Sequence, residues 1–453
     1  MKKFFAVTLV ALLLFGLIFG VAGCATEDHA GMEEVRSVQW YKKEYSADEL
    51  HKIAAADFLS LNEIDYDLPY EVRAVTEKYV DAIKTFSDRL YAACIAQGDV
   101  GMNFAFSPIG VYEILHLLLL ASENESVRDA LTDLIGVSCE EAKTDFINAY
   151  KNDYFSNEFG TLRRYNGAFF SKDNAVSTEY LQELTDRYVD AYQMNFQSAS
   201  GVDKMVAWVN ERLREEGFLK EEDLDLTSDT SFVFFSTMFF DNGWAHSFLT
   251  DKTYEDTFFG EVRKKASFMR HTYHGRVYDY GSYVSCYDYY ANGMSVKYFT
   301  PKEKTEDIFA LLDGKSLFFD DPGKEILGEN GLIVDLSVPK FSAECSYTFD
   351  NALKSLGQTE MYRSSSHAFD KMYTDLTPAE SIYLSFIKSK SKVSFSEDGT
   401  IVKSYIMAQG EKASSVGPGA KRETIEIKLD SPFAYVIYDR SGIPLYVGRV
   451  ENV

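Results

Sequence analysis

Hydrophobic residues recur at intervals of three and four early in the chain. From residue 72 onward they occupy Val75, Tyr79, Ile83, Phe86, Leu90 and Ala93. This spacing places them on one face of an α-helix. Gly98 follows the last of them, and a glycine in this position commonly ends a helix. The pattern therefore predicts an amphipathic helix that stops at Gly98.

A second pattern is an almost unbroken apolar run at residues 232–240, FVFFSTMFF. A run of this kind is typical of a strand that is covered on both faces. We therefore expect a central strand here.

A third pattern occupies residues 392–416, which begin like a strand and continue without proline up to Gly417. About twenty residues are long for a passive connection. In an extended chain, one side would carry only small or apolar side chains: Thr400, Val402, Ser404, Ile406, Ala408 and Gly410. Such a segment could add a strand to a sheet with room for it. A surface β-hairpin with a long tip accounts for the same periodicity.

Six short motifs together resemble the serpin family of serine protease inhibitors. They lie at residues 103–110 (NFAFSPIG), 239–244 (FFDNGW), 338–341 (VPKF), 397–400 (EDGT), 430–433 (DSPF) and 445–450 (LYVGRV). The resemblance covers about residues 72–453, which we expect to form the serpin domain. It implies an α+β serpin fold with a large central mixed sheet, two smaller sheets and about nine helices. It also implies an exposed reactive-centre loop at about residues 397–425.

The resemblance implies that this loop acts as a suicide substrate. A serine protease would cleave it and form an acyl-enzyme, and the hinge side would insert into the large sheet. The family pattern assigns the hinge to Glu397, Gly399, Thr400 and Val402. Fourteen residues beyond Gly399, the cleaved bond is expected between Ala413 and Ser414, with Lys412 and Arg422 as alternatives. Alanine at this position suits an elastase-like or subtilisin-like protease with a small primary pocket.

The resemblance also identifies residues of the breach and shutter, the places where the sheet opens: Lys340, Trp244, Ser107 and Asn103. Glu397 matches a family glutamate that pairs with the lysine at position 340. Other residues depart from the family pattern: Gly110, Ser236 and Ser389 at the shutter, and the bulky hinge residues Ile401 to Tyr405 in place of alanines. These departures favour an alternative, a non-inhibitory surface-anchored protein that uses the serpin fold for binding or structure.

The N-terminus has the features of an export signal. Two lysines precede an apolar run that ends at residue 23, which is typical of a signal peptide. The sequence before Cys24 resembles a bacterial lipobox, so we expect Cys24 to be lipidated and residues 24–71 to form a tether. An uncleaved membrane anchor is the alternative. Either form would place the protein at the cell membrane, facing the extracellular side or the periplasm.

The chain is strongly acidic, with 46 Lys and Arg against 70 Asp and Glu and a net charge of −24. Such a charge disfavours nucleic-acid binding and favours a basic partner. The sequence contains no nucleophile elbow, phosphate-binding loop or zinc-protease motif. We therefore expect no enzyme activity, cofactor or metal, and a monomer.

His271 and His274 are expected to be surface residues. We expect buried free thiols at Cys94, Cys139, Cys286 and Cys345. One disulfide between two of them, formed in an oxidising compartment, is the alternative.

Overall fold

The computed structural model describes residues 57–68, 71–98, 103–328, 331–400 and 423–453, which all fall in one compact unit, residues 35–453. These residues form three β-sheets and eight α-helices. The expected α+β fold, with one large and two smaller sheets, is confirmed. Cys24, Val402, Lys412, Ala413, Ser414 and Arg422 lie outside the described residues.

The large sheet has eight strands. Seven follow the order β1 (Phe58–Ser60), β5 (Val189–Met194), β4 (Gly160–Ser171), β6 (Phe232–Asn242), β15 (Gly399–Thr400), β14 (Lys388–Ser396) and β13 (Phe341–Thr348). The eighth, β3 (Phe155–Asn157), pairs with β4. The β4–β5 pair is parallel and the other pairs are antiparallel. The sheet is therefore mixed, as expected.

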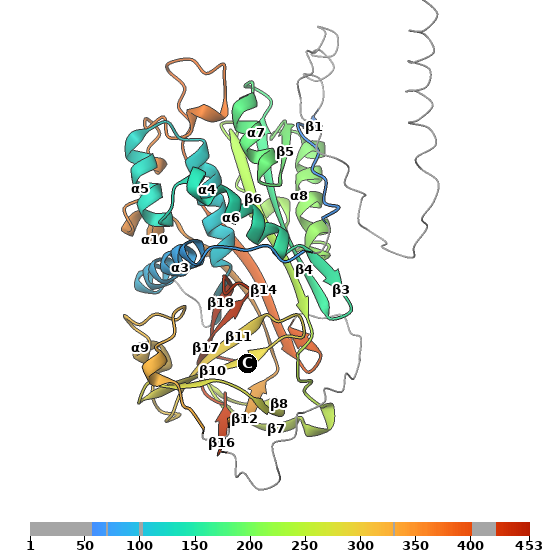
Figure 1. Ribbon diagram of the computed structural model, residues 1–453. Helices are drawn as coiled ribbons and strands as arrows, with labels where there is room; N and C mark the ends of the chain where they lie inside the picture. Colours follow the sequence, from blue (N-terminus) through green and yellow to red (C-terminus); the bar gives the residue numbers. More distant parts are fainter. Residues whose placement is uncertain (1–56, 69–70, 99–102, 329–330, 401–422) are drawn as a thin grey trace, which may run out of the picture. The chain divides into compact units, whose positions relative to one another are not determined.

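The two smaller sheets lie toward the end of the molecule where β7 and β16 are labelled (Figure 1). One has the order β2 (Asn103–Phe106), β18 (Pro444–Val450), β17 (Phe433–Tyr438), β11 (Ser295–Pro301), β10 (Tyr283–Tyr289) and β9 (Val277–Asp279). The other has the order β16 (Glu423–Lys428), β12 (Leu332–Pro339), β8 (Arg263–His274) and β7 (Tyr254–Phe259).

The helices are α3 (Glu77–Gln97), α4 (Pro108–Leu120), α5 (Glu125–Ile135), α6 (Cys139–Asn152), α7 (Thr178–Asp186), α8 (Ala199–Leu213), α9 (Ile308–Leu311) and α10 (Asp350–Ser355). The first six begin at a Thr, Ser or Asn whose side chain accepts a hydrogen bond from the backbone N–H three residues later. Such N-caps satisfy donors that the first turn leaves free, so the local sequence determines where these helices start.

Two sequence predictions can be compared directly with these elements. Helix α3 buries Tyr79, Ile83, Phe86 and Leu90 and ends at Gly98, whose φ of 73° is left-handed, so the predicted helix is confirmed. Strand β6 is also present where expected, but only Thr237, Phe240 and Asn242 are buried. The expected double burial is therefore wrong, and the reason is that one edge of β6 borders a cavity.

Residues 57–68, the N-terminal arm, pack on the folded body although they lie within the stretch expected to be a tether. β1 pairs with β5, and the side chain of Asn62 makes three hydrogen bonds, to Thr185, Val189 and Ala191. Ile64 and Tyr66 are buried in a hydrophobic cluster that also contains Tyr165 of β4 and Trp208 of α8. The alternation of polar and apolar residues in the arm fits this half-buried position.

None of the helices in the described part of the chain is long and apolar enough to cross a bilayer.

Candidate functional site

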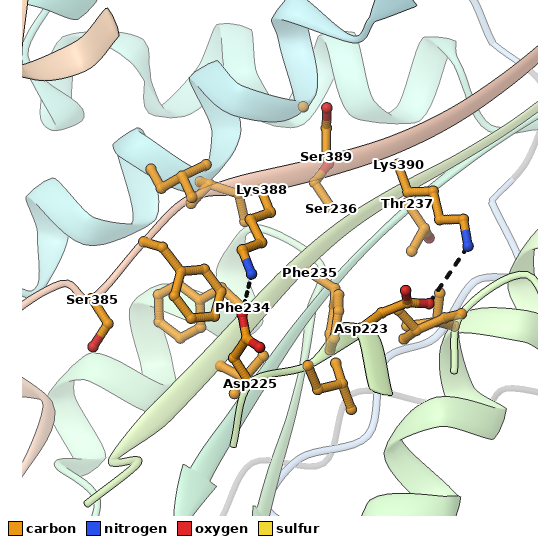
Figure 2. Close-up of a pocket in the computed structure, with 18 of the residues that line it drawn as sticks. Asp223, Asp225, Phe234, Phe235, Ser236, Thr237, Ser385, Lys388, Ser389 and Lys390 are labelled. Carbon is orange, nitrogen blue, oxygen red and sulfur yellow. Dashed lines mark hydrogen bonds and ion pairs between the residues drawn. The ribbon is translucent and has the colours of Figure 1, made fainter. Parts of the chain in front are cut away.

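A cavity of about 1880 Å³ lies between β6 and β14 and is lined by residues of both strands. β6 pairs with β4 on one side. On its other side, within the described residues, it pairs with Thr400 alone. Figure 2 shows the labelled side chains of Phe234 to Thr237 on β6 and of Lys388 to Lys390 on β14 around this space. We call the space between residues 232–240 and 388–394 the sheet gap.

The hinge closes one end of the sheet gap. Thr400 pairs with Phe395 of β14 and with Asn242 of β6, and its side chain is 1% exposed. Its hydroxyl shares a 2.7 Å hydrogen bond with the hydroxyl of Tyr290. Thr400 therefore already occupies the first position of a strand between β6 and β14.

Gly399 is required by the backbone at this position. Its φ is +149°, and a Cβ atom would lie 2.2 Å from the backbone oxygen of Asn242. Only glycine combines this conformation with so close an approach. The glycine of the EDGT motif thus allows the chain to leave β14 and turn into the sheet gap.

Trp244 supports the hinge from the side of β6. Its indole Nε1 donates a 2.9 Å hydrogen bond to the backbone oxygen of Ser396. Its ring stacks on Tyr290, with centroids 4.8 Å apart, and the same tyrosine contacts Thr400. Trp244 therefore lies beside the hinge, and its place at the opening of the sheet stays a prediction.

Lys340 and Glu397 form the expected ion pair, with Nζ and Oε2 2.8 Å apart. Thr253 donates a second hydrogen bond to the other carboxylate oxygen. Partial burial opposes ionisation of Glu397, but the bonds from Lys340 and Thr253 outweigh it and hold its pKa below the usual value. Because Lys340 is 42% exposed, the pair stabilises the hinge by about 1 kcal/mol at most.

The shutter residues meet near the middle of the sheet gap. Ser107 caps α4 by accepting from the N–H of Gly110 at 3.1 Å. A Cβ at Gly110 would lie 3.3 Å from the hydroxyl of Ser107 and 3.4 Å from that of Ser236, so all three are close together. Ser389 lines the same cavity from β14, and its buried hydroxyl has no hydrogen-bond partner within the described residues.

The buried carboxylate of Glu113 on α4 was not found from the sequence. It pairs with Arg164 at 2.5 Å and accepts hydrogen bonds from Asn166 at 3.2 Å and from Ser236 at 3.3 Å. Arg164 also pairs with Asp153 at 3.1 Å. Glu113 thereby attaches β4 and β6, one side of the sheet gap, to the helix behind them.

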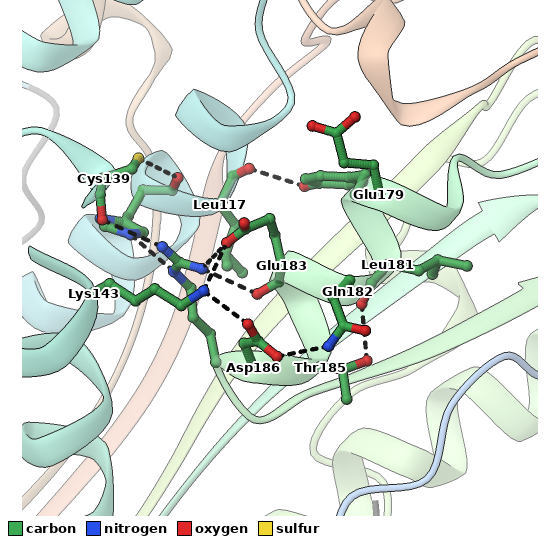
Figure 3. A network of polar contacts seen from close by, with 12 residues as sticks. Leu117, Cys139, Lys143, Glu179, Leu181, Gln182, Glu183, Thr185 and Asp186 are labelled. Carbon is green, nitrogen blue, oxygen red and sulfur yellow. Dashed lines mark hydrogen bonds and ion pairs between the residues drawn. The ribbon is translucent and has the colours of Figure 1, made fainter. Parts of the chain in front are cut away.

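A second polar network joins α4 to α6 and α7 (Figure 3). The buried guanidinium of Arg187 donates to His116 Nε2 at 3.2 Å and to the Cys139 backbone oxygen at 3.3 Å, and it pairs with Glu183. Burial, and then the charge of Arg187, lowers the pKa of His116 to about 3. His116 is therefore a neutral acceptor at physiological pH. Lys143 extends the network to Asp186 at 2.7 Å.

Asn103 does not join the other predicted site residues. Its side chain donates to the backbone oxygen of Asn452 and accepts from the N–H groups of Glu451 and Asn452. It therefore fastens the C-terminal end of the chain beside β2.

The expectation for His271 is wrong, because this residue is 5% exposed. Its Nδ1 lies 2.9 Å from the His246 backbone oxygen and its Nε2 lies 3.1 Å from Asp288 Oδ2. The carboxylate comes from β10, a strand of the other small sheet, so no local spacing indicated it. The four described cysteines are free thiols, and Cys139 is only half-buried. The described residues contain no group of three or more His, Cys, Asp or Glu that could bind a metal.

Comparisons with known proteins agree with this geometry. The family Serpin (serine protease inhibitor) matches residues 81–453. Serine protease inhibitor A3B of Mus musculus is 22% identical over 370 residues, covering 77% of this chain and 83% of its own. Plasma serine protease inhibitor of Mus musculus is 24% identical over 383 residues, covering 82% and 89%.

Among solved structures, the thermophilic serpin tengpin in its native state superposes with a TM-score of 0.71 at 20% identity. The match covers 84% of this chain and 96% of tengpin. The family is one of protease inhibitors and not of catalytic enzymes. Because the family match extends from residue 81, within α3, to residue 453, the chain belongs to the serpin family.

Proposed function

We propose that this protein inhibits a serine protease as a suicide substrate at the bacterial cell surface. The observation that carries the proposal is the position of Thr400. This residue is buried at one end of the sheet gap, between β14 and β6. A strand that continued from Thr400 between β14 and β6 would fill the sheet gap.

The chemistry begins with the protease. Its serine oxygen attacks the carbonyl carbon of Ala413, and the bond to the nitrogen of Ser414 breaks. The amine leaves with a proton, and an ester joins the protease to Ala413. Water would normally hydrolyse this ester and release both proteins.

Insertion competes with that hydrolysis. Thr400 lies opposite Phe395 in an antiparallel pair, so each further residue would move one position back along β14. Val402 would then face Val393 and Ser404 would face Ser391, both of which are buried. An uncharged side chain is tolerated at each of these inward positions.

The free energy of insertion is large. A dozen residues that gain about 1 kcal/mol per net hydrogen bond would stabilise the cleaved chain by on the order of 10 kcal/mol. The acylated end moves with the new strand, so the attached protease is carried across the molecule and its active site is distorted. Deacylation then stalls.

The residues at the cleaved bond suggest the target. Alanine at position 413 suits elastase-like or subtilisin-like proteases with small primary pockets, whereas cleavage after Lys412 or Arg422 would suit a trypsin-like enzyme. The net charge of −24 favours a basic protease. We propose that the inhibitor acts as a monomer.

The proposed location rests on the N-terminal sequence. Removal of residues 1–23 and lipidation of Cys24 would attach the protein to the membrane, facing the extracellular side or the periplasm. There it would protect the cell or its surface enzymes from secreted proteases.

The test is incubation of the full-length protein in detergent with elastase, subtilisin and trypsin, followed by a denaturing gel and intact-mass measurement. A denaturant-resistant 1:1 adduct, with release of a peptide that begins at Ser414, is expected. Clean loop cleavage without an adduct by all three would contradict the proposal. It would favour the alternative, a non-inhibitory binding or structural protein, which the changed shutter residues Gly110, Ser236 and Ser389 also favour.

A further inference from the structure

Three lysines occupy alternate positions of β14, at Lys388, Lys390 and Lys392. Successive side chains of a strand point to opposite faces. Since Ser391 and Val393 are buried, the lysines lie on the other face of the sheet. All three line the cavity of the sheet gap.

Each of these lysines pairs with a carboxylate from the connection between α8 and β6, residues 214–231. Lys388 pairs with Asp225, Lys390 lies 3.5 Å from Asp223, and Lys392 lies 2.6 Å from Glu215. Lys390 also lies 3.7 Å from Glu344 of β13. Figure 2 shows the first two of these contacts. The three acidic residues line the same cavity as the lysines.

The connection is fixed to the side of the sheet gap that β6 and β4 form. Trp208 of α8 packs on Phe235 of β6, with centroids 6.4 Å apart, and a Cβ at Gly167 of β4 would lie 2.7 Å from its ring. Asn210 of α8 holds the connection by two hydrogen bonds to the backbone of Leu219. The three ion pairs therefore join the two sides of the gap.

We propose that these ion pairs form a clasp over the sheet gap, which an incoming strand must open and which sets the rate of its insertion. The clasp consists of Lys388, Lys390 and Lys392 with Asp225, Asp223 and Glu215. This inference rests on the proposed function and concerns its regulation. A slow insertion gives the acyl-enzyme time to hydrolyse, so the clasp determines what fraction of cleavage events traps the protease.

The position of the hinge gives the order of events. A strand that grows from Thr400, opposite Phe395, meets Lys392 first and Lys388 last. In this register Lys392, Lys390 and Lys388 lie opposite positions 403, 405 and 407, so the clasp opposes the first half of insertion once one or two residues have entered. All six side chains are between 24% and 59% exposed, so salt screens them. Three exposed pairs of ordinary strength would together slow a rate by about tenfold.

The test compares the full-length wild-type protein with the triple variant Glu215→Gln, Asp223→Asn, Asp225→Asn. Amide side chains keep an acceptor oxygen, so Asp223→Asn can still accept from the N–H of Lys220. A control variant, Glu71→Gln, Asp133→Asn, Glu141→Gln, removes the same number of charges from exposed ion pairs with Arg73, Arg89 and Lys78. Each protein is mixed with saturating elastase, and the rate of insertion is followed by tryptophan fluorescence. Trp208 and Trp244, which lie beside the gap, contribute to this signal.

The clasp variant is expected to insert about tenfold faster than wild type at low salt and to trap more protease per cleavage event. Wild type is expected to approach that rate as salt is raised, and the control variant to match wild type. Equal rates for the clasp variant and wild type, with the usual rise in melting temperature after cleavage, would overturn the clasp but leave the proposed function intact. No rise in melting temperature in any of the three proteins would overturn both.

Discussion

The substitution Thr400→Arg tests whether insertion begins at the buried hinge. Thr400 is 1% exposed, and its hydroxyl shares a hydrogen bond with Tyr290. The larger side chain of arginine carries a charge, whereas the described partners of Thr400, which are Tyr290, Asn242 and Phe395, are uncharged. Thr400→Val is the matched control, because valine has the same branched shape and lacks only the hydroxyl.

The expected effects differ in size between the uncleaved and the cleaved protein. Burying an unpaired guanidinium would cost several kcal/mol, whereas leaving the hinge outside the sheet costs about 1 kcal/mol for each hydrogen bond that Thr400 loses, to Tyr290 and to the two strands. The arginine variant is therefore expected to keep its hinge outside, and the uncleaved protein is expected to lose only a few kcal/mol of stability. The gain of on the order of 10 kcal/mol after cleavage would be largely lost, since the strand enters from this end.

Melting temperature measures this gain. At about 2.1 cal/mol/K per residue, the unfolding entropy of the 373 residues matched by the family is about 0.8 kcal/mol/K, so 10 kcal/mol corresponds to a rise of about 12 °C. Wild type and Thr400→Val should show a rise of this order after loop cleavage, and Thr400→Arg should not. Denaturing gels should show adducts for the first two proteins and cleaved substrate for the third.

The reasoning is refuted if Thr400→Arg forms adducts at the wild-type stoichiometry and its melting temperature rises on cleavage by as much as that of wild type. It is also refuted if Thr400→Val loses both properties, because the hydroxyl would then matter more than the exclusion of charge.

Three further predictions concern stability, measured by urea unfolding. Because the folded protein holds the pKa of His116 at about 3, below the unfolded value of about 6.5, the stability that neutral His116 contributes is present above pH 6.5 and lost as pH falls. Wild type should lose about 2 kcal/mol relative to His116→Gln between pH 7 and pH 5, and parallel pH curves would contradict this. Asn62→Ala should lower the free energy of unfolding by about 2–3 kcal/mol, because it leaves buried backbone groups unpaired. The control Glu63→Ala, at the exposed neighbouring residue, should change this free energy little. Glu113→Ala should cost about 3–5 kcal/mol because it removes a buried partner of Arg164; a loss below 1 kcal/mol would exclude a structural role for this ion pair.

Much of the fold could be predicted because its signals are local. The spacing of apolar residues in α3 and the run in β6 each identify an element from its own residues. The motif that contains Gly399 could be recognised because its backbone conformation excludes other residues. The ion pair of Lys340 and Glu397 was expected from two separate motifs.

The rest depends on contacts between residues far apart in the chain. Glu113 lies in an apolar helix, and nothing near it in the sequence indicates Arg164, which is 51 positions away. The alternating lysines of β14 are visible in the sequence, but their partner Asp225 is 163 positions away from Lys388. The partial exposure of β6 could not be predicted either, because it depends on what lies beside the strand and not on its composition.

The N-terminal arm has a consequence for how an anchored molecule would be oriented. β1 pairs with the Tyr192–Met194 end of β5, which lies, through β4, beside the start of β6. Thr400 pairs with Asn242, at the other end of β6. A tether attached through the arm would therefore hold the protein by the end of the large sheet opposite the hinge and turn the hinge toward the surroundings. From Cys24 to Asp57 the chain spans at most about 120 Å. An anchored molecule would therefore reach no farther than that from the membrane surface, and the hydrogen bonds between β1 and β5 would bear any pull on the tether.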